Sequence, residues 1–189
     1  MLDCTSAAAL RATVSPPPRW PTHIKVILLS LVGGFLGILG SFVGELQAGG
    51  FLLIVFIGAP IIEEALKPIG VYLALVRWPR ALTNRLYRAL LCAGAGAVFG
   101  LIESAIYVFV YAPDHPDWYP AFRFTVPVFL HALASFVVGL GLDWRMPEWV
   151  NHGTKLPKRA RNFYFAGVTM HATYNTLAVV LTFAGVFDF

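Results

Sequence analysis

The sequence predicts an all-α polytopic membrane protein with about five transmembrane helices, its N-terminus in the cytoplasm and its C-terminus outside. Of the 189 residues, 58% are hydrophobic and only 13% are charged. The mean hydropathy is +0.70, well above the range of soluble domains. Five apolar segments reach the length of about 20 residues that a spanning helix needs. Lys and Arg gather at alternate ends of these segments, as they do when they face the cytoplasm.

The chain divides into a short tail and one transmembrane domain. Residues 1–22 contain a run of prolines and lack the apolar core of a signal peptide, so they predict a flexible cytoplasmic tail. Residues 23–189 predict a single transmembrane helical domain. Its five expected spans lie at about residues 23–45, 50–78, 81–111, 122–142 and 161–187.

Each span has a feature that suits packing inside a membrane. The first carries a face of glycines and a serine, of the kind that lets two helices approach closely. The second is long enough to tilt, and Pro60 and Pro68 predict kinks on either side of an acidic pair. The third carries Gly96-x-x-x-Gly100, and the fourth and fifth each carry a histidine. These features predict close helix packing around polar side chains.

The distribution of basic residues predicts the orientation and explains the net charge of +4. The five-span topology puts every Lys and Arg on the cytoplasmic side except Arg123 and the intramembrane Lys67. The opposite loops carry Glu45, Asp114 and Asp117. We therefore expect a multi-pass protein of the cell membrane that is surrounded by the lipid bilayer and has no nucleic-acid partner. The plasma membrane of a prokaryote is the expected location.

Glu63 and Glu64 stand in the second span, inside a run apolar enough to cross a membrane. A charge at the bilayer centre costs about 3 kcal/mol on insertion scales, so carboxylates found there usually face a protein interior or water and mark a functional site. Lys67 follows one helical turn after Glu63 and can partly neutralise the pair. Adjacent residues point about 100° apart on a helix, so one glutamate can face a cavity while the other pairs with Lys67.

Polar side chains on three other spans fall at a similar depth, because a helix rises by about 1.5 Å per residue. His131 and Ser135 are four residues apart, as are His171 and Asn175, so each pair lies on one helical face. One such residue alone is explained by a hydrogen bond between helices. Their coincidence on several helices instead predicts one site. The catalytic candidates are Glu63, Glu64, Glu103, His131, His171 and Asn175, and the supporting candidates are Lys67 and Ser135.

These groups suit hydrolysis by an activated water. A water held between a carboxylate and an imidazole can lose a proton to the carboxylate as it attacks a carbonyl. His171 and Asn175 can donate hydrogen bonds to the oxyanion that forms. A Gly-x-Ser-x-Gly elbow is absent from the sequence, which disfavours a serine nucleophile. No base that could activate the intramembrane Cys92 is evident from the sequence, which disfavours a cysteine nucleophile. Either glutamate can act as the base. Lys67 lies one helical turn from Glu63 and can pair with it, which favours Glu64 as the base.

A metal site is the rival use of the same atoms, since two histidines and one glutamate are a known zinc set. The His-Glu-x-x-His signature is absent from the sequence. The two cysteines, Cys4 and Cys92, support no thiolate cluster. The sequence therefore favours a site that needs no cofactor, with zinc as the alternative.

Four short motifs, each on its own span, resemble those of the PrsW family of intramembrane proteases. They are Glu63-Glu64-x-x-Lys67, Phe99-x-x-x-Glu103, His131-x-x-x-Ser135 and His171-x-x-x-Asn175. That family belongs to a larger group with the type II CAAX prenyl proteases and bacteriocin-immunity-type membrane proteins. Two departures separate this chain from the prenyl-protease branch. That branch has a histidine at the position of Glu103. It also has an arginine four residues after the glutamate pair, whereas this chain has Lys67 three residues after the pair.

The resemblance implies a glutamate-dependent protease whose site lies within the membrane. It matches Glu63 and Glu64 to the catalytic glutamate pair, and His171 and Asn175 to the residues that stabilise the oxyanion. It also implies that the substrate is a single-span membrane protein similar to an anti-sigma factor. Two other functions compete with this one: a non-catalytic scaffold or immunity protein of the same superfamily, and a proton-linked transporter.

Overall fold

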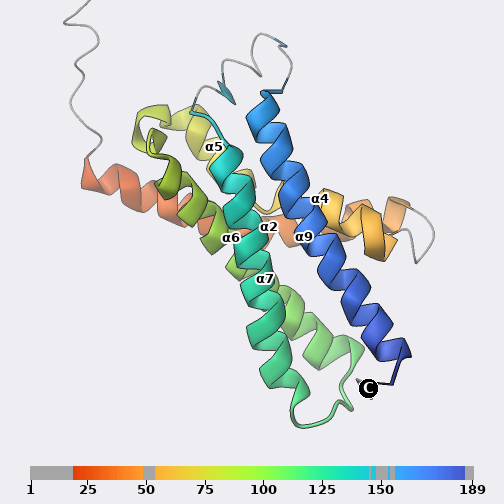
Figure 1. The fold of residues 1–189 in the computed structure, drawn as a ribbon. Coiled ribbons are helices and arrows are strands. Elements are labelled where there is room, and N and C mark those ends of the chain that lie inside the picture. The colour runs from red at the N-terminus through yellow and green to blue at the C-terminus, as the bar shows by residue number, and fades with distance from the viewer. Residues whose placement is uncertain (1–18, 49–53, 145, 148–152, 154–155, 186–189) are drawn as a thin grey trace, which may run out of the picture.

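The computed structural model describes residues 19–48, 54–144, 146–147, 153 and 156–185, and these ranges contain helices and no strand (Figure 1). The all-α class predicted from composition is confirmed. In chain order the helices are α2 (Trp20–Ala48), the π-helix η1 (Ile54–Gly58), α4 (Ala59–Leu66), α5 (Ile69–Arg77), the 3-10 helix η2 (Pro79–Leu82), α6 (Arg85–Ile106), the π-helix η3 (Tyr107–Tyr111), α7 (Tyr119–Gly141) and α9 (Lys158–Phe183).

Three helical segments among the described residues are long and apolar enough to cross a membrane. They are Trp20–Ser41 in α2, Arg85–Tyr111 in α6 and η3, and Tyr119–Gly141 in α7, with mean hydropathies of 2.0, 1.9 and 1.8. They correspond to the first, third and fourth predicted spans. Because α2 begins at Trp20, the helix starts before the predicted boundary at residue 23. Residues 1–18 of the predicted tail lie outside the described residues.

The second predicted span is not one helix, and the kink expected at Pro68 is a break between two helices. The segment is divided into η1, α4 and α5, and the backbone leaves the helix at Lys67 and Pro68. A proline lacks the N–H of a helical hydrogen bond, and its ring clashes with the preceding turn, so Pro68 ends α4. Pro60 lies in the first turn of α4, directly after η1, at a position where prolines are well tolerated. The kink expected at Pro60 stays a prediction.

The fifth predicted span corresponds to α9, which has 26 residues and begins at Lys158. It does not reach the apolarity of the three spanning segments, because His171, Asn175 and several threonines interrupt the apolar residues of its later turns. The helix packs against α7, α4 and η1. This packing buries His171 inside the protein, where a polar side chain costs less than it does in lipid.

Glycines let the helices approach closely near the polar residues. A Cβ added to Gly96 of α6 would overlap the carbonyl oxygen of His131 on α7. One added to Gly33 of α2 would likewise overlap the backbone of Gly70 on α5. The close packing predicted from the glycine spacing is therefore confirmed, and it holds His131 directly against α6.

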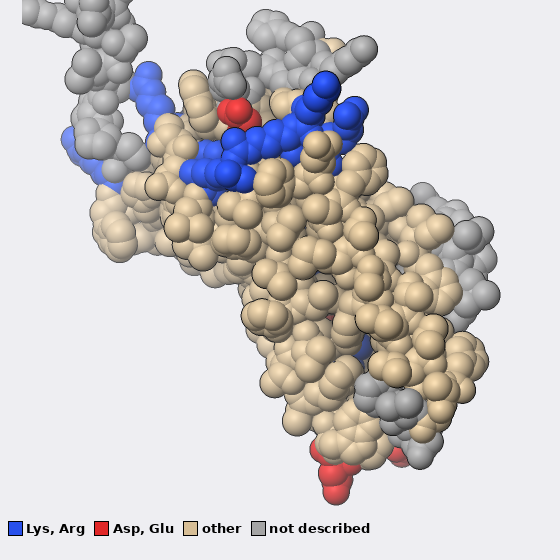
Figure 2. All heavy atoms as spheres, viewed as in Figure 1, with Lys and Arg blue, Asp and Glu red and all other residues tan. Residues whose placement is uncertain are grey.

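Charged side chains separate along the molecule. Figure 2 shows Lys and Arg gathered at the end where α5 leads into α6 and where α9 begins. Acidic side chains mark the opposite end, and one lies among the basic ones. This separation is what the predicted orientation requires, and the orientation itself stays a prediction.

Candidate active site

Two adjacent carboxylates are buried on the short helix α4. Glu63 is 4% exposed and Glu64 is 0% exposed. Their helix packs against α2, α7 and α9, so side chains that point about 100° apart are both covered. A buried carboxylate needs a cation or hydrogen bonds to compensate for its lost hydration. The cation in this site is Lys67.

Lys67 lies at the break between α4 and α5, and its ammonium reaches both carboxylates. Its Nζ is 2.6 Å from Oε1 of Glu64 and 3.0 Å from Oε2 of Glu63. The lysine side chain is 0% exposed. The ring of Phe99 on α6 lies 4.6 Å from the ammonium and adds a cation–π contact. Lys67 therefore contacts Glu63, as its spacing predicts, but its closer partner is Glu64.

Two imidazoles complete the surroundings of the ammonium. Nδ1 of His131 lies 2.7 Å from Nζ of Lys67, and because an ammonium only donates, this Nδ1 accepts the hydrogen bond. Nδ1 of His171 lies 3.5 Å from Nζ and 3.1 Å from Oε1 of Glu64. Since a carboxylate only accepts, this second Nδ1 donates to Glu64. The two histidines therefore differ at Nδ1, which is an acceptor in one and a donor in the other.

Glu103 holds His131 from the side away from the ammonium. Nε2 of His131 donates to Oε2 of Glu103 at 2.9 Å, and Arg123 donates to the same oxygen at 3.3 Å. The guanidinium of Arg123 lies 3.9 Å from the centre of the Tyr107 ring. The sequence pattern marks Arg123 only as a basic residue away from the cytoplasmic side. That unusual position is the signal from which its role beside the site could have been predicted.

The other predicted residues are Ser135 and Asn175. The hydroxyl of Ser135 is buried and donates to Oε2 of Glu64 at 3.4 Å. Asn175 lies one turn beyond His171 on α9 and is partly buried. Its oxyanion role stays a prediction. The residues that these contacts join into one cluster are Glu63, Glu64, Lys67, Glu103, His131, Ser135 and His171.

One oxygen in the cluster lacks a directed hydrogen bond. Oε2 of Glu63 is buried and lies 3.0 Å from the Lys67 ammonium, but this close ion pair does not have the direction of a hydrogen bond. The same oxygen is 3.9 Å from Nδ1 of His131 and 3.8 Å from Nδ1 of His171. A buried polar atom in this condition commonly takes a water or an ion as its partner.

The sequence profile of the PrsW family matches residues 19–188, from the start of α2 to beyond the end of α9. The chain belongs to the PrsW family. Members of this family are described as intramembrane metalloproteases. No curated protein and no solved structure matches the chain. The match confirms the PrsW resemblance and the class of intramembrane protease, whereas the wider kinship with prenyl proteases rests on the motifs alone.

The PrsW description as a metalloprotease agrees with the donor atoms at the centre of the cluster. Glu63, His131 and His171 each offer one ligand atom, and these atoms all lie within 4.8 Å of one another. Two histidines and one glutamate form a known zinc set. Oε2 of Glu63 is also the oxygen that lacks a directed hydrogen bond. These residues fit a zinc ion, and the expectation of a cofactor-free site stays unconfirmed.

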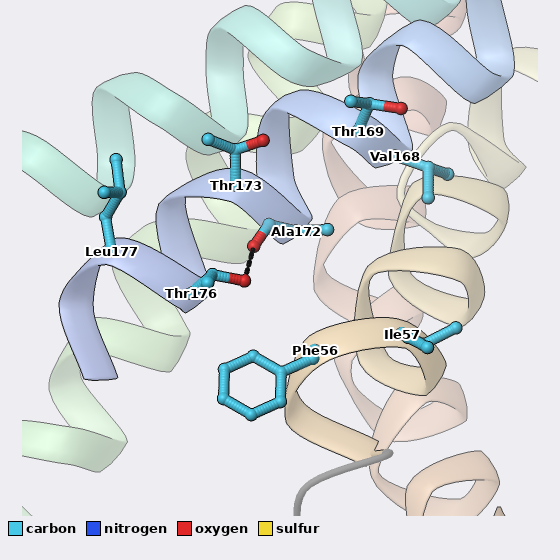
Figure 3. Close-up of a pocket in the computed structure, with 8 residues that line it drawn as sticks. All are labelled: Phe56, Ile57, Val168, Thr169, Ala172, Thr173, Thr176 and Leu177. Atoms are coloured by element: carbon cyan, nitrogen blue, oxygen red, sulfur yellow. Dashed lines mark hydrogen bonds between the residues drawn. The ribbon is translucent and has the colours of Figure 1, made fainter. Parts of the chain in front are cut away.

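A pocket of about 370 Å³ lies on the outside of the PrsW helices, between η1 and α9 (Figure 3). Ala172 in its wall directly follows His171 in the sequence, so the pocket and the cluster share a turn of α9. Thr169 and Thr176 donate their hydroxyls to carbonyls of their own helix, which leaves a largely apolar wall. The lining residues are Phe56, Ile57, Val168, Thr169, Ala172, Thr173, Thr176 and Leu177.

Proposed function

We propose that this chain is an intramembrane endopeptidase that hydrolyses a peptide bond in a membrane-anchored protein. The observation that carries the proposal is Oε2 of Glu63, a buried carboxylate oxygen without a directed hydrogen bond that faces two imidazoles and an ammonium. A water at this oxygen has a base on one side and polar groups around it. Membership of the PrsW family supports the same activity. The proposed substrate is a single-span protein similar to an anti-sigma factor, in a prokaryotic plasma membrane.

We assign the base to Glu63, although the sequence favours Glu64. Oε1 of Glu64 accepts from Lys67 at 2.6 Å and from His171 at 3.1 Å. Its Oε2 accepts from Ser135. Both oxygens of Glu64 are therefore engaged, whereas Oε2 of Glu63 keeps lone pairs for a water.

The reaction follows from these positions without a covalent intermediate. Water attacks the carbonyl carbon of the scissile bond while Glu63 takes one of its protons. The carbonyl oxygen becomes an oxyanion, for which His171 and Asn175 are the proposed hydrogen-bond donors. The C–N bond of the tetrahedral intermediate then breaks, and Glu63 returns the proton to the leaving nitrogen. The glutamate ends as it began, and only water is consumed.

The zinc donor set supports a second form of the same hydrolysis. Glu63, His131 and His171 would hold the ion, which supplies a Lewis acid and lowers the pKa of a bound water. Glu103 keeps Nε2 of His131 turned away from the centre, so Nδ1 is the nitrogen left for the ion. With Glu63 as a ligand, the carboxylate left to accept a proton is Glu64. The presence of a metal thus decides which glutamate acts as the base.

The pocket between η1 and α9 suits the substrate segment beside the scissile bond. Its wall is largely apolar, and it shares a turn of α9 with His171. The acidic pair and both histidines are almost fully buried, so helices around the site have to separate before a peptide can reach them. In this proposal an unwound substrate segment first rests in the pocket and then enters between η1 and α9.

Cleavage of a peptide that contains a transmembrane segment, by the purified chain in liposomes, tests the proposal. Glu63→Gln should lower the rate by about 100-fold or more, the usual contribution of a general base. Asp114→Asn, in the exposed connection between η3 and α7, is the matched control and should cleave normally. Normal cleavage by Glu63→Gln would overturn the mechanism. A wild-type chain that binds the peptide without cutting it would support the scaffold function instead.

Metal dependence is decided in the same assay. A chelator should have no effect if the site works without a cofactor. Loss of cleavage with a chelator, followed by recovery with added zinc, would select the metal form. Glu64→Gln then separates the two forms further, because only the metal form uses Glu64 as the proton acceptor.

A further inference from the structure

The geometry points to the Lys67 ammonium as the cation that occupies the position between the zinc-donor residues. A zinc ion would need the same position, so the ammonium and the zinc ion exclude each other. Nζ lies 3.0 Å from Oε2 of Glu63, 2.7 Å from Nδ1 of His131 and 3.5 Å from Nδ1 of His171. These three residues are also the ones that offer metal ligands. The inference deepens the proposed function, on whose site it rests, and it is tested by binding rather than by cleavage.

The ammonium uses a lone pair that a metal ion would need. Zinc binds a histidine nitrogen through its lone pair, and Nδ1 of His131 already accepts a hydrogen bond from Lys67. The other nitrogen of this ring is engaged elsewhere, because Nε2 donates to Glu103. Nδ1 of His131 therefore serves either the lysine or a metal ion.

Charge strengthens this exclusion. Glu63 and Glu64 bring two carboxylates into the buried site, and Lys67 compensates part of their charge. A divalent ion placed beside the ammonium would be repelled by it, and the repulsion is strong because buried charges are poorly screened. An ion that replaces the ammonium would instead balance the two carboxylates.

The site is also built to hold a primary ammonium. The Phe99 ring that covers Nζ is itself only 1% exposed, so Lys67 has an aromatic face in addition to its carboxylate and imidazole partners. Its backbone is held at the helix break, where its N–H donates to the carbonyl of Glu63 at 2.8 Å and Pro68 precedes the next helix. Lys67 therefore determines which cation, its own ammonium or a metal ion, occupies the site.

A zinc titration of the purified full-length chain in detergent tests this inference, with a chromophoric chelator as the competitor. Lys67→Met removes the charge and keeps an unbranched side chain. This variant should bind one zinc ion per chain with an affinity about tenfold or more above that of the wild type. Residues next to metal ligands change metal affinity by amounts of this size. Adding His171→Ala should abolish this gain. Lys158→Met, at the exposed start of α9, is the matched control and should bind as the wild type does.

Two further measurements keep the test decisive. Lys67→Gln repeats the titration if the methionine variant does not fold, as judged by thermal unfolding. In the zinc-loaded wild type, an amine-reactive label should modify Lys67 faster, because the ion displaces its side chain. Equal zinc affinity in the wild type and the folded Lys67 variants would overturn the inference. A folded Lys67 variant that binds no zinc, or unchanged labelling in the zinc-loaded wild type, would do the same.

Discussion

Nε2 of His131 donates a hydrogen bond to Oε2 of Glu103 over 2.9 Å, and this bond joins the neighbouring helices α7 and α6. It leaves Nδ1 of the same ring facing Lys67. Arg123 holds the same oxygen of Glu103 at 3.3 Å. Glu103 is therefore a positioning residue, which acts on the proposed reaction through the imidazole.

Glu103→Gln keeps the shape of the side chain but replaces a charge-assisted hydrogen bond to His131 with a neutral one. We expect kcat to fall by about 10- to 100-fold, as it does when the partner that orients a site histidine is lost. KM should change little, because Glu103 does not contact the substrate in the proposed site. Steady-state cleavage of the transmembrane peptide measures both constants. An unchanged kcat would contradict the positioning role, and Glu103→Asp should restore part of the rate.

The two glutamates should differ in their contribution to stability. Glu64→Gln weakens the closest ion pair of Lys67 and the bonds from His171 and Ser135. The free energy of unfolding should therefore fall by about 3 kcal/mol, the usual cost of breaking a buried pair. Glu63→Gln should cost less, since Oε2 of Glu63 lacks a directed hydrogen bond. Denaturant unfolding in detergent compares the two variants, and equal losses would argue against Glu64 as the structural partner.

Gly96→Ala should separate α6 from α7, because a Cβ at this position would overlap the carbonyl oxygen of His131 and lie 2.8 Å from Cβ of Ser135. We expect a loss of about 1–3 kcal/mol in stability, as for other overpacked sites, and a parallel loss of cleavage. Gly94→Ala is the matched control on the same helix, since its Cβ would meet a methyl group of Leu31 at 3.3 Å. If the two variants were equally stable and active, the close approach of α6 and α7 would not be needed.

Thr173→Trp should obstruct the pocket between η1 and α9, because Thr173 is an exposed residue of its wall. If the pocket holds the substrate segment, KM should rise several-fold while kcat changes less. Thr125→Trp places the same side chain on an exposed part of α7 and should leave both constants unchanged. Equal KM values in the two tryptophan variants would exclude the pocket from the substrate path.

Hydropathy was sufficient to place the three apolar spans, whereas the kink expected in the second came from Pro68 and not from hydropathy. The apolar run continues on both sides of Lys67 and Pro68, so its average carries no mark of the point where α4 ends. The end depends on the backbone hydrogen bond that a proline removes, and the same residue type at Pro60 only starts a helix. The position of the break matters because it is where Lys67 enters the site.

The sequence by itself determined the helical membrane class, the family motifs and most of the polar side chains that the structure joins into one cluster, because polar groups in apolar segments need partners away from lipid. Only the tertiary structure decided what each of them does. Glu64 is the closer partner of Lys67, and Glu63 keeps the oxygen that lacks a directed hydrogen bond, because α7 and α9 bring their histidines and serine to one side of the pair. These distances depend on how helices pack against one another, which the periodicity of a single helix does not contain.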